Sequence, residues 1–369
     1  MGKDAGQTQT ILNLPPGVPP LTSIYLYAAG SCNLACRHCW ISPAFKPNNG
    51  DGAFIPVEWV EKAIREALPL GLRQVKFTGG EPTTHPEFRQ LIHLARQAGL
   101  GILIETNGTL VDESLAHFLK EQRVGFVSVS LDGARAETHE WLRMVPGSFG
   151  RAVQGVRALV SNGIPTQLIF TIHTGNVGEI DDFVRMAQEL GCNSVKFNHV
   201  QKIGRGERFA KENGLGMDEV LSVYHRIEID IARKYRIPVQ FDIPYAFLPI
   251  RRLLAQKRLC SVQNILGLLS GGELALCGIG VNEPDLVYGR VEQDDLVEVW
   301  TRNEKLTLLR ELIPMQLEGI CTQCIHRYIC QGHCVASNYH LSGKLNAPYW
   351  FCDLADGMGL FPSSRKIAV

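Results

Sequence analysis

The sequence of 369 residues contains no long apolar run and carries no net charge. A membrane-spanning helix needs about 20 consecutive apolar residues, and the apolar runs of this sequence are much shorter. The segment from Met1 to Thr10 is polar and lacks the apolar core of a secretory signal. Lysine plus arginine and aspartate plus glutamate number 37 each, so no charge excess favours nucleic acid. We expect a cytoplasmic protein without a membrane or nucleic-acid partner.

Cysteine, in contrast, is abundant, with 11 residues in the chain. An odd number does not suit a disulfide framework, and disulfides are rare in reducing compartments. Clustered cysteines in a cytosol-like sequence more often bind metals. The chain is also long enough for one large domain and a smaller one.

Three cysteines follow a C-x3-C-x2-C pattern at Cys32, Cys36 and Cys39, directly after the apolar segment 21–28. Three thiolates can bind three irons of a cubane cluster and leave the fourth iron open, whereas four-cysteine sites fill every iron. The alternative is a zinc knuckle completed by His38, because structural zinc takes four ligands. The pattern therefore predicts a metal centre and leaves two kinds open.

Strand-like and helix-like segments alternate after this loop. Apolar residues recur with helical periodicity over 56–68 and in the segments between the later strands. Regular alternation predicts parallel strands joined by right-handed crossovers, with functional residues at the C-terminal ends of the strands. The predicted strands are 21–28, 74–78, 101–105, 126–131, 167–172 and 194–198.

The cysteine loop and the motif Gly79-Gly80-Glu81-Pro82 after the second strand together resemble the radical S-adenosylmethionine (SAM) superfamily. The resemblance implies an α/β fold with a partial (β/α)6 TIM-type barrel. It implies that the three cysteines bind a [4Fe–4S] cluster whose open iron chelates SAM. Reductive cleavage of SAM would then give a 5′-deoxyadenosyl radical that abstracts hydrogen. Without the resemblance, the glycine motif reads as a tight turn with a solvated glutamate.

The same resemblance assigns a SAM pocket but no catalytic side chain beyond the cluster. Trp40 would pack against the adenine, and Arg143 would pair with the SAM carboxylate, although a surface ion pair is the alternative for Arg143. His173 and His199 follow strands and are read as substrate-facing or structural. The residues assigned to SAM binding are Thr78, Gly79, Gly80, Glu81, Pro82, Asn107, Ser130, Asp132, Arg143 and Trp40.

A second cysteine set in the C-terminal third resembles the SPASM domain of radical SAM peptide-modifying enzymes. Two zinc sites are the structural alternative, because thiolates also suit zinc. The resemblance implies two auxiliary [4Fe–4S] clusters, for three in all. Cys321, Cys324, Cys330 and Cys352 would bind the outer cluster, and Cys260, Cys277 and Cys334 would bind the inner one.

The resemblance also divides the chain. We expect a flexible lead at 1–20, the partial barrel at 21–206, a bridging region at 207–255, and a small cysteine-rich α+β SPASM domain at 256–369. The sequence departs from sulfatase-maturing relatives, since 253–259 lacks their additional cysteine, Gly278 replaces an aspartate, and Thr78 replaces a glutamine.

We therefore expect a radical SAM oxidoreductase other than a sulfatase-maturing enzyme. The favoured function is maturation of a ribosomally synthesised peptide by an oxidative cross-link at an unactivated carbon. A separate recognition protein is a possible further partner, and flavodoxin or ferredoxin is the expected reductant. The alternative is tetrapyrrole or quinone-cofactor biosynthesis on a small molecule.

Overall fold

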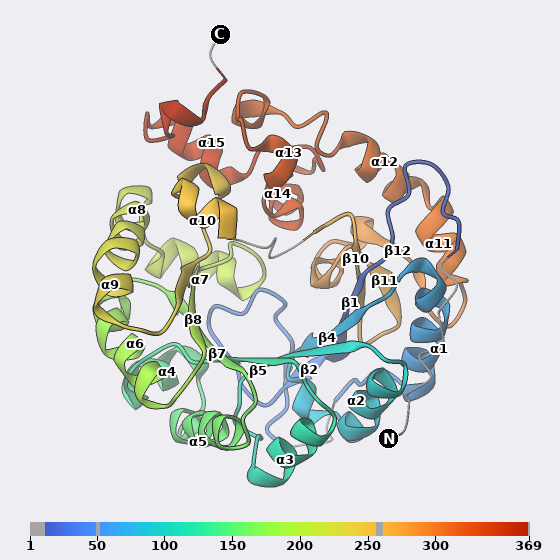
Figure 1. Ribbon diagram of the computed structural model, residues 1–369, viewed down its shortest axis with the longest axis horizontal. Coiled ribbons are helices and arrows are strands. Elements are labelled where there is room, and N and C mark those ends of the chain that lie inside the picture. The colour runs from blue at the N-terminus through green and yellow to red at the C-terminus, as the bar shows by residue number, and fades with distance from the viewer. Residues whose placement is uncertain (1–11, 49–51, 256–260, 368–369) are drawn as a thin grey trace, which may run out of the picture.

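A mostly parallel β-sheet organises the chain, with helices packed around its outside (Figure 1). The computed structural model describes residues 12–48, 52–255 and 261–367. Within these residues the main sheet has the order β12-β11-β10-β1-β4-β5-β6-β7-β8-β9. The strands from β10 to β9 run parallel, and β11 and β12 extend one edge in antiparallel fashion. The curved arrangement is a partial barrel with a C-terminal extension.

The strands of this sheet are short and of similar length. They are β1 (Ser23–Ala29), β4 (Gln74–Gly79), β5 (Gly101–Thr106), β6 (Phe126–Ser130), β7 (Thr166–Ile172), β8 (Ser194–His199), β9 (Val239–Phe241), β10 (Ile265–Leu268), β11 (Glu273–Ala275) and β12 (Val287–Arg290). A separate small sheet pairs β2 (Ser31–Cys32) with β3 (Ala44–Phe45).

The helices between the barrel strands form an outer layer. They are α1 (Val57–Ala67), α2 (Phe88–Gln97), α3 (Glu113–Glu121), α4 (Ala136–Arg143), α5 (Ser148–Ser161), α6 (Ile180–Glu189), α7 (Arg205–Asn213), α8 (Met217–Arg226), α9 (Ala232–Lys234) and α10 (Ile250–Ala255). The C-terminal part adds α11 (Leu296–Arg302), α12 (Glu304–Leu312), α13 (Arg327–Cys330), α14 (Val335–Ser342) and α15 (Trp350–Gly357). None of the described helices has the length and apolar character needed to cross a bilayer.

The two faces of each barrel strand differ in chemistry. On β8, Val195 and Phe197 are fully buried, and Phe197 contacts Phe183 of α6. The alternate residues Lys196 and Asn198 instead line a cavity inside the barrel. Successive strand residues point to opposite faces. The apolar residues of β8 therefore pack against the outer helices, while its polar residues face the interior of the barrel.

The six predicted strands are present, with ends shifted by at most a few residues. The sequence analysis missed β9, from the bridging region, and β10 to β12, from the C-terminal region. These strands have three or four residues each, which is too short to give a clear two-residue periodicity. They join the barrel sheet at its two edges, so the predicted segments share one sheet.

The outer layer gives a test of the fold. Phe170 of β7 is fully buried and contacts the rings of Phe183 and Phe197 at centroid distances of 4.5 and 5.7 Å. Phe170→Ala should lower the free energy of unfolding by about 3–5 kcal/mol, because the cavity left behind cannot collapse fully. Phe45→Ala, at a position 46% exposed, is the matched control and should change it by less than about 1 kcal/mol. Equal effects in anaerobic chemical denaturation would contradict this packing.

Candidate active site

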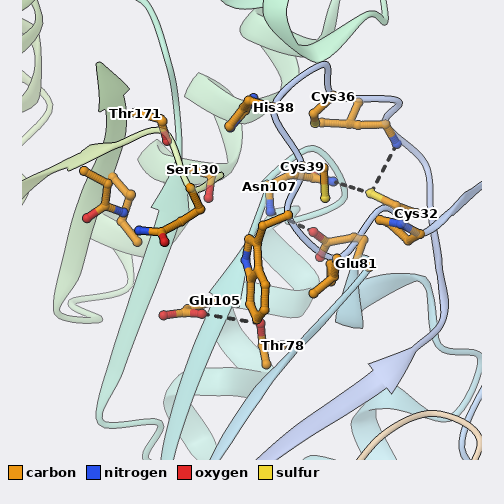
Figure 2. Close-up of a pocket in the computed structure, with 18 of the residues that line it drawn as sticks. Cys32, Cys36, His38, Cys39, Thr78, Glu81, Glu105, Asn107, Ser130 and Thr171 are labelled. Atoms are coloured by element: carbon orange, nitrogen blue, oxygen red, sulfur yellow. Dashed lines mark hydrogen bonds between the residues drawn. The ribbon is translucent and has the colours of Figure 1, made fainter. Parts of the chain in front are cut away.

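The cysteine loop lies at the C-terminal end of β1 and borders a cavity of about 310 Å³. Figure 2 shows Cys32, Cys36 and Cys39 on one side of this cavity and Ser130 and Thr171 on the other. Of the other residues assigned to SAM, Trp40, Thr78, Gly79, Gly80, Glu81, Asn107 and Arg143 also line it. The structure thus brings most of the predicted pocket together.

The sulfur atoms of the loop lie among hydrogen-bond donors. The backbone N–H of Leu34 donates to Cys32 Sγ at 3.3 Å, and Asn107 Nδ2 donates to the same sulfur at 3.9 Å. Arg143 Nη1 donates to Cys36 Sγ at 3.5 Å. Burial raises the pKa of Cys32 and of Cys36, so each sulfur needs a bound cation to exist as a thiolate. Buried sulfurs with donors around them fit an iron–sulfur cluster.

Glu81 organises the motif that follows β4. One carboxylate oxygen accepts hydrogen bonds from the hydroxyls of Thr83 and Thr106, both at 2.6 Å, and from the backbone of Thr83 at 3.1 Å. The other oxygen accepts from the backbone N–H of Asn107 at 2.7 Å. The side chain is 1% exposed, and burial raises its pKa despite these donors. Glu81 therefore joins the ends of β4 and β5 next to the position assigned to SAM.

Arg143 is buried, so its interpretation as part of a surface ion pair is wrong. Its Nη2 lies 2.5 Å from Asp132 Oδ2, and Asp132 Oδ1 accepts from the backbone N–H of Thr171 at 2.8 Å. Although burial opposes it, Arg143 together with His38 holds the pKa of Asp132 below its ordinary value. Asp132 is fully buried behind Arg143, where it fixes the guanidinium against Cys36. Pro82 is also buried and begins a short 3-10 helix behind the cavity.

The segment Gly204-Arg205-Gly206 holds the cysteine loop from the far side of the barrel. The backbone N–H of Arg205 donates to the Cys39 carbonyl at 3.1 Å, and its Nε donates to the Cys36 carbonyl at 2.9 Å. A Cβ at Gly204 would overlap the Trp40 carbonyl oxygen. In the sequence, Gly204-Arg205-Gly206 resembles a loop that closes such barrels near the cofactor, but the contacts of Arg205 with the cysteine loop were not predicted.

A second cavity, also of about 310 Å³, adjoins the first and shares several of its lining residues, including Trp40, Thr78 and Lys196. Oppositely charged side chains meet at this junction. Lys76 Nζ lies 2.6 Å from Glu105 Oε1, and Lys196 Nζ lies 3.5 Å from Asp242 Oδ2. Glu105 also accepts a hydrogen bond from Thr78 at 3.3 Å (Figure 2).

The charges at this junction stabilise the ionised carboxylates. Although burial opposes it, Lys76 and Lys196 hold the pKa of Glu105 below its ordinary value. Burial also opposes the ionisation of Asp242, but Lys196 and His333 lower its pKa to about 2. The sequence analysis missed these four charged residues as a group, because the pairing of Lys196 with Asp242 depends on β9, a strand of only three residues.

The sequence did not decide whether His173 and His199 face substrate or are structural, and the two side chains differ in their surroundings. His173 is fully buried, stacks on Trp141 at 5.6 Å, and has its Nδ1 engaged by the backbone of Gly175 at 3.1 Å. His199 lines the first cavity, and its Nε2 lies 3.1 Å from the hydroxyl of Tyr349. Burial lowers the pKa of His199 to about 4, so the ring is neutral near pH 7. The structural interpretation fits His173, while His199 borders the site.

The C-terminal cysteines lie in two neighbouring places. Burial raises the pKa of the Cys352 thiol, and the thiols of Cys330, Cys321 and Cys324 raise it further. Cys277 and Cys334 line the second cavity. Cys260 lies outside the described residues. Within the described residues, no three His, Cys, Asp or Glu side chains gather closely enough to bind a single metal ion.

The site and the fold define the class of protein. Residues 27–187 match the Radical SAM superfamily. The matched segment contains the cysteine loop, the Gly79-Gly80-Glu81-Pro82 motif and Arg143. Residues 27–187 therefore form the radical SAM domain of an enzyme, in a superfamily that uses a [4Fe–4S] cluster and SAM, and the C-terminal part carries the cysteine pattern of SPASM domains.

Its relatives include enzymes with two kinds of substrate. An AdoMet-dependent heme synthase of Methanosarcina barkeri is 26% identical over 325 residues, covering 85% of this chain and 90% of the relative. The mycofactocin maturase MftC of Mycobacterium ulcerans is 27% identical over 322 residues, covering 86% and 84%. Streptococcus suis SuiB, bound to its precursor peptide SuiA, has a TM-score of 0.70 and 16% identity, covering 90% and 76%. The likeness to SuiB shows the shared fold.

The close approach of Gly80 to the cysteine loop gives a second test. A Cβ at this position would overlap the carbonyl oxygen of Ser31, and neither backbone can move without displacing Cys32. Gly80→Ala should reduce iron bound at the loop and SAM cleavage by roughly tenfold or more, since this overlap is with rigid backbone. Gly150→Ala, in a helix with open space around it, is the control and should retain both. Normal iron content and SAM cleavage in Gly80→Ala would contradict the geometry.

Proposed function

We propose that this enzyme oxidatively modifies a ribosomally synthesised peptide and forms a cross-link at an unactivated carbon. The observation that supports the proposal is the pair of adjoining cavities between the SAM loop and the C-terminal cysteines. The iron–sulfur cluster, when bound, supplies the electron for SAM cleavage, and the resulting radical abstracts a substrate hydrogen. A substrate held at the junction would lie next to both cysteine sets.

Two auxiliary [4Fe–4S] clusters complete the proposed oxidation. Forming a new bond at a carbon that has lost one hydrogen atom requires the loss of one more electron and a proton. Cys321, Cys324, Cys330 and Cys352 would bind the outer cluster, and all of them except the partly exposed Cys330 are buried. Cys277 and Cys334, with Cys260, would bind the inner cluster beside the second cavity. An electron acceptor next to the substrate makes the reaction a net oxidation.

The size of the second cavity favours a peptide segment over a larger molecule, because the first cavity is assigned to SAM. The second cavity, of about 310 Å³, is at the lower end of the roughly 300–1,000 Å³ range of small-molecule pockets. One or two side chains of a peptide that enters from outside would occupy this space. The maturases MftC and SuiB are consistent with such a substrate. A separate recognition protein would supply any additional contacts to the precursor.

Tetrapyrrole or quinone-cofactor biosynthesis remains the second candidate. The heme synthase of M. barkeri and an Fe-coproporphyrin III synthase of the same organism, 28% identical over 329 residues, favour the tetrapyrrole. The lining of the second cavity includes several aromatic and aliphatic side chains, among them Tyr25, Tyr27 and Ile265. A rigid apolar ring could pack against these side chains.

Residues of this chain would orient the two reactants. Arg143, fixed by Asp132, would face the SAM carboxylate, and Trp40 would pack on the adenine. Asn107, Thr78 and Ser130 line the same cavity and would complete the SAM contacts. Lys196 lines both cavities, where its ammonium group would hold a polar group of the substrate. In this proposal the ion pairs Arg143–Asp132 and Lys196–Asp242 position the groups that would bind SAM and the substrate.

Anaerobic reconstitution tests the cluster content. With iron, sulfide and a flavodoxin or ferredoxin reductant, the chain should bind about twelve irons and cleave SAM to 5′-deoxyadenosine. About four irons with SAM cleavage would remove the auxiliary clusters from the proposal. Incubation with short peptides encoded beside the gene, followed by mass spectrometry, should show the loss of two hydrogens. A product from a porphyrin substrate alone would favour the second candidate.

Lys196→Met tests the link between the two cavities. SAM cleavage without substrate should stay near the wild-type rate, because the Lys196 ammonium group pairs with Asp242 rather than with the cysteine loop. Product formation should fall roughly tenfold or more, as expected for a lost charge-assisted hydrogen bond. Lys211→Met, with the lysine side chain 73% exposed in an i,i+4 pair, is the matched control. An equal loss of SAM cleavage and product would show that Lys196 supports the SAM site instead.

A further inference from the structure

A smaller cavity, of about 180 Å³, lies beside the first one, and we call it the side cavity. His199, at the end of β8, lines both cavities, so they are neighbours at the same end of the barrel. The other walls include parts of α7, α8 and α15, and α8 packs against α15 (Figure 1). The lining includes Ile172, His199, Lys202, Ala210, Trp350 and Leu354. The side cavity therefore lies where the barrel mouth meets the C-terminal part.

One charged side chain lines the side cavity. Among the described lining residues only Lys202 is charged, since His199 is neutral near pH 7. Burial lowers the pKa of the Lys202 ammonium group, and no carboxylate of the described residues counters this effect. The side chain is partly buried and forms no ion pair or hydrogen bond within the described part of the chain. A partly buried charge without a counter-ion is costly, so this position favours an anion that enters from outside.

Trp350 holds the ammonium group at the wall of the side cavity. Lys202 Nζ lies 4.1 Å from the centroid of the Trp350 ring, in a cation–π contact. The Trp350 ring in turn contacts the rings of His199 and Tyr349 at centroid distances of 5.5 and 5.7 Å. An ammonium group carries three N–H donors, and the aromatic ring covers only one side of it. The remaining donors can therefore bind an acceptor that enters the side cavity.

The chemistry of the lining selects a carboxylate on a short aliphatic stem. An apolar occupant would remove water from the Lys202 ammonium group without replacing its hydrogen bonds, which is unfavourable. A carboxylate replaces them with charge-assisted hydrogen bonds, and the apolar walls suit the methylene groups that carry it. The cavity also borders Met217 and Trp350, the first residues of α8 and α15, and the N-terminal end of a helix favours negative charge. Aspartate and glutamate side chains have both features.

The position and size of the side cavity favour a peptide as the source of this carboxylate. Its volume of about 180 Å³ is below the roughly 300–1,000 Å³ range of small-molecule pockets, so it suits a single side chain. No described residue lines both the side cavity and the second cavity, whereas His199 connects the side cavity to the first. A flexible chain can pass from the second cavity to Lys202 by way of the first, whereas a rigid ring occupies a single cavity.

We propose that the side cavity binds an acidic side chain of the peptide substrate, whose carboxylate pairs with Lys202. The inference rests on the proposed peptide substrate and adds a class of side chain that this substrate carries near the residue to be oxidised. No bond forms or breaks at Lys202. Its role is to hold the peptide in one register across the barrel mouth, so that a single carbon faces the SAM site.

Binding of two blocked pentapeptides tests the side cavity directly. One peptide has glutamate between two pairs of glycines and the other has glutamine, and calorimetry measures their affinity for the anaerobic, SAM-bound full chain. Wild type should bind the glutamate peptide roughly tenfold more tightly, as expected for a charge-assisted hydrogen bond. Lys202→Met should lose this preference, while Lys202→Arg should keep it. Lys211→Met, at an exposed lysine of α7, is the matched control and should behave as wild type.

Ala210→Leu is a second variant, and it keeps the charge of Lys202. Because Ala210 of α7 lines the side cavity, a larger side chain there should exclude the glutamate and remove the preference over glutamine. Both Lys202→Met and Ala210→Leu should cleave SAM at the wild-type rate without substrate, since neither residue lines the first cavity. Equal affinity of the wild type for the two peptides, or no binding of either, would overturn the proposal.

Turnover shows whether the contact positions the substrate. In a peptide that the enzyme oxidises, replacing one acidic residue by its amide should raise KM roughly tenfold and leave kcat near the wild-type value, since the contact is the same before and during the reaction. Lys202→Glu should have the same defect, and a lysine at that position of the peptide should restore KM.

The outcomes separate this inference from the proposed function. Oxidation of a peptide that needs no acidic residue would refute the inference and leave the proposed function intact. Binding of the glutamate peptide that depends on Lys202, without oxidation of any peptide, would contradict the proposed function and leave the carboxylate site intact. Displacement of that peptide by a porphyrin that the enzyme oxidises would assign the site to a porphyrin carboxylate and refute the peptide as its occupant.

Discussion

The carboxylate of Glu81 connects the segments on which the site depends. Its hydrogen bonds reach Thr106 and Asn107 at the end of β5, while its own backbone N–H donates to the Ser31 carbonyl at 3.1 Å. One buried residue, through its side chain and its backbone, thereby fixes the cysteine loop, the glycine motif and the Asn107 turn relative to one another. A buried carboxylate that lost these donors would be strongly destabilised, so the three segments are held as a unit.

The rest of the barrel mouth is built from charged side chains in pairs, the most deeply buried of which is Arg143 with Asp132. Arg143 pairs with Asp132, Lys76 with Glu105, and Lys196 with Asp242. Buried ion pairs add little to stability because desolvation offsets their attraction, but they fix geometry where a single arrangement is needed. Such pairs suit a site that must hold a cofactor and a substrate in contact and keep water away from a radical.

Part of this site was readable from the sequence because its signals are local. The spacing of Cys32, Cys36 and Cys39 is visible in the sequence itself, and the two glycines before Glu81 are required by the close approach of their backbone to that of Ala29 and Ser31. Lys196 and Asp242 were not readable, because their relation depends on β9, a strand of three residues that pairs with β8.

The joining of β10 to β1 explains how the C-terminal part is aligned with the barrel. β1 leads into the cysteine loop, and β10 runs parallel to it with Leu26 opposite Leu268. Through the hairpin with β11, this ladder places Cys277 near Tyr27 of β1. A Cβ at Gly278 would overlap the Tyr27 ring, so an aspartate does not fit there without displacing the ring. The Tyr27 ring thus occupies the space into which the side chain of an aspartate at this position would extend.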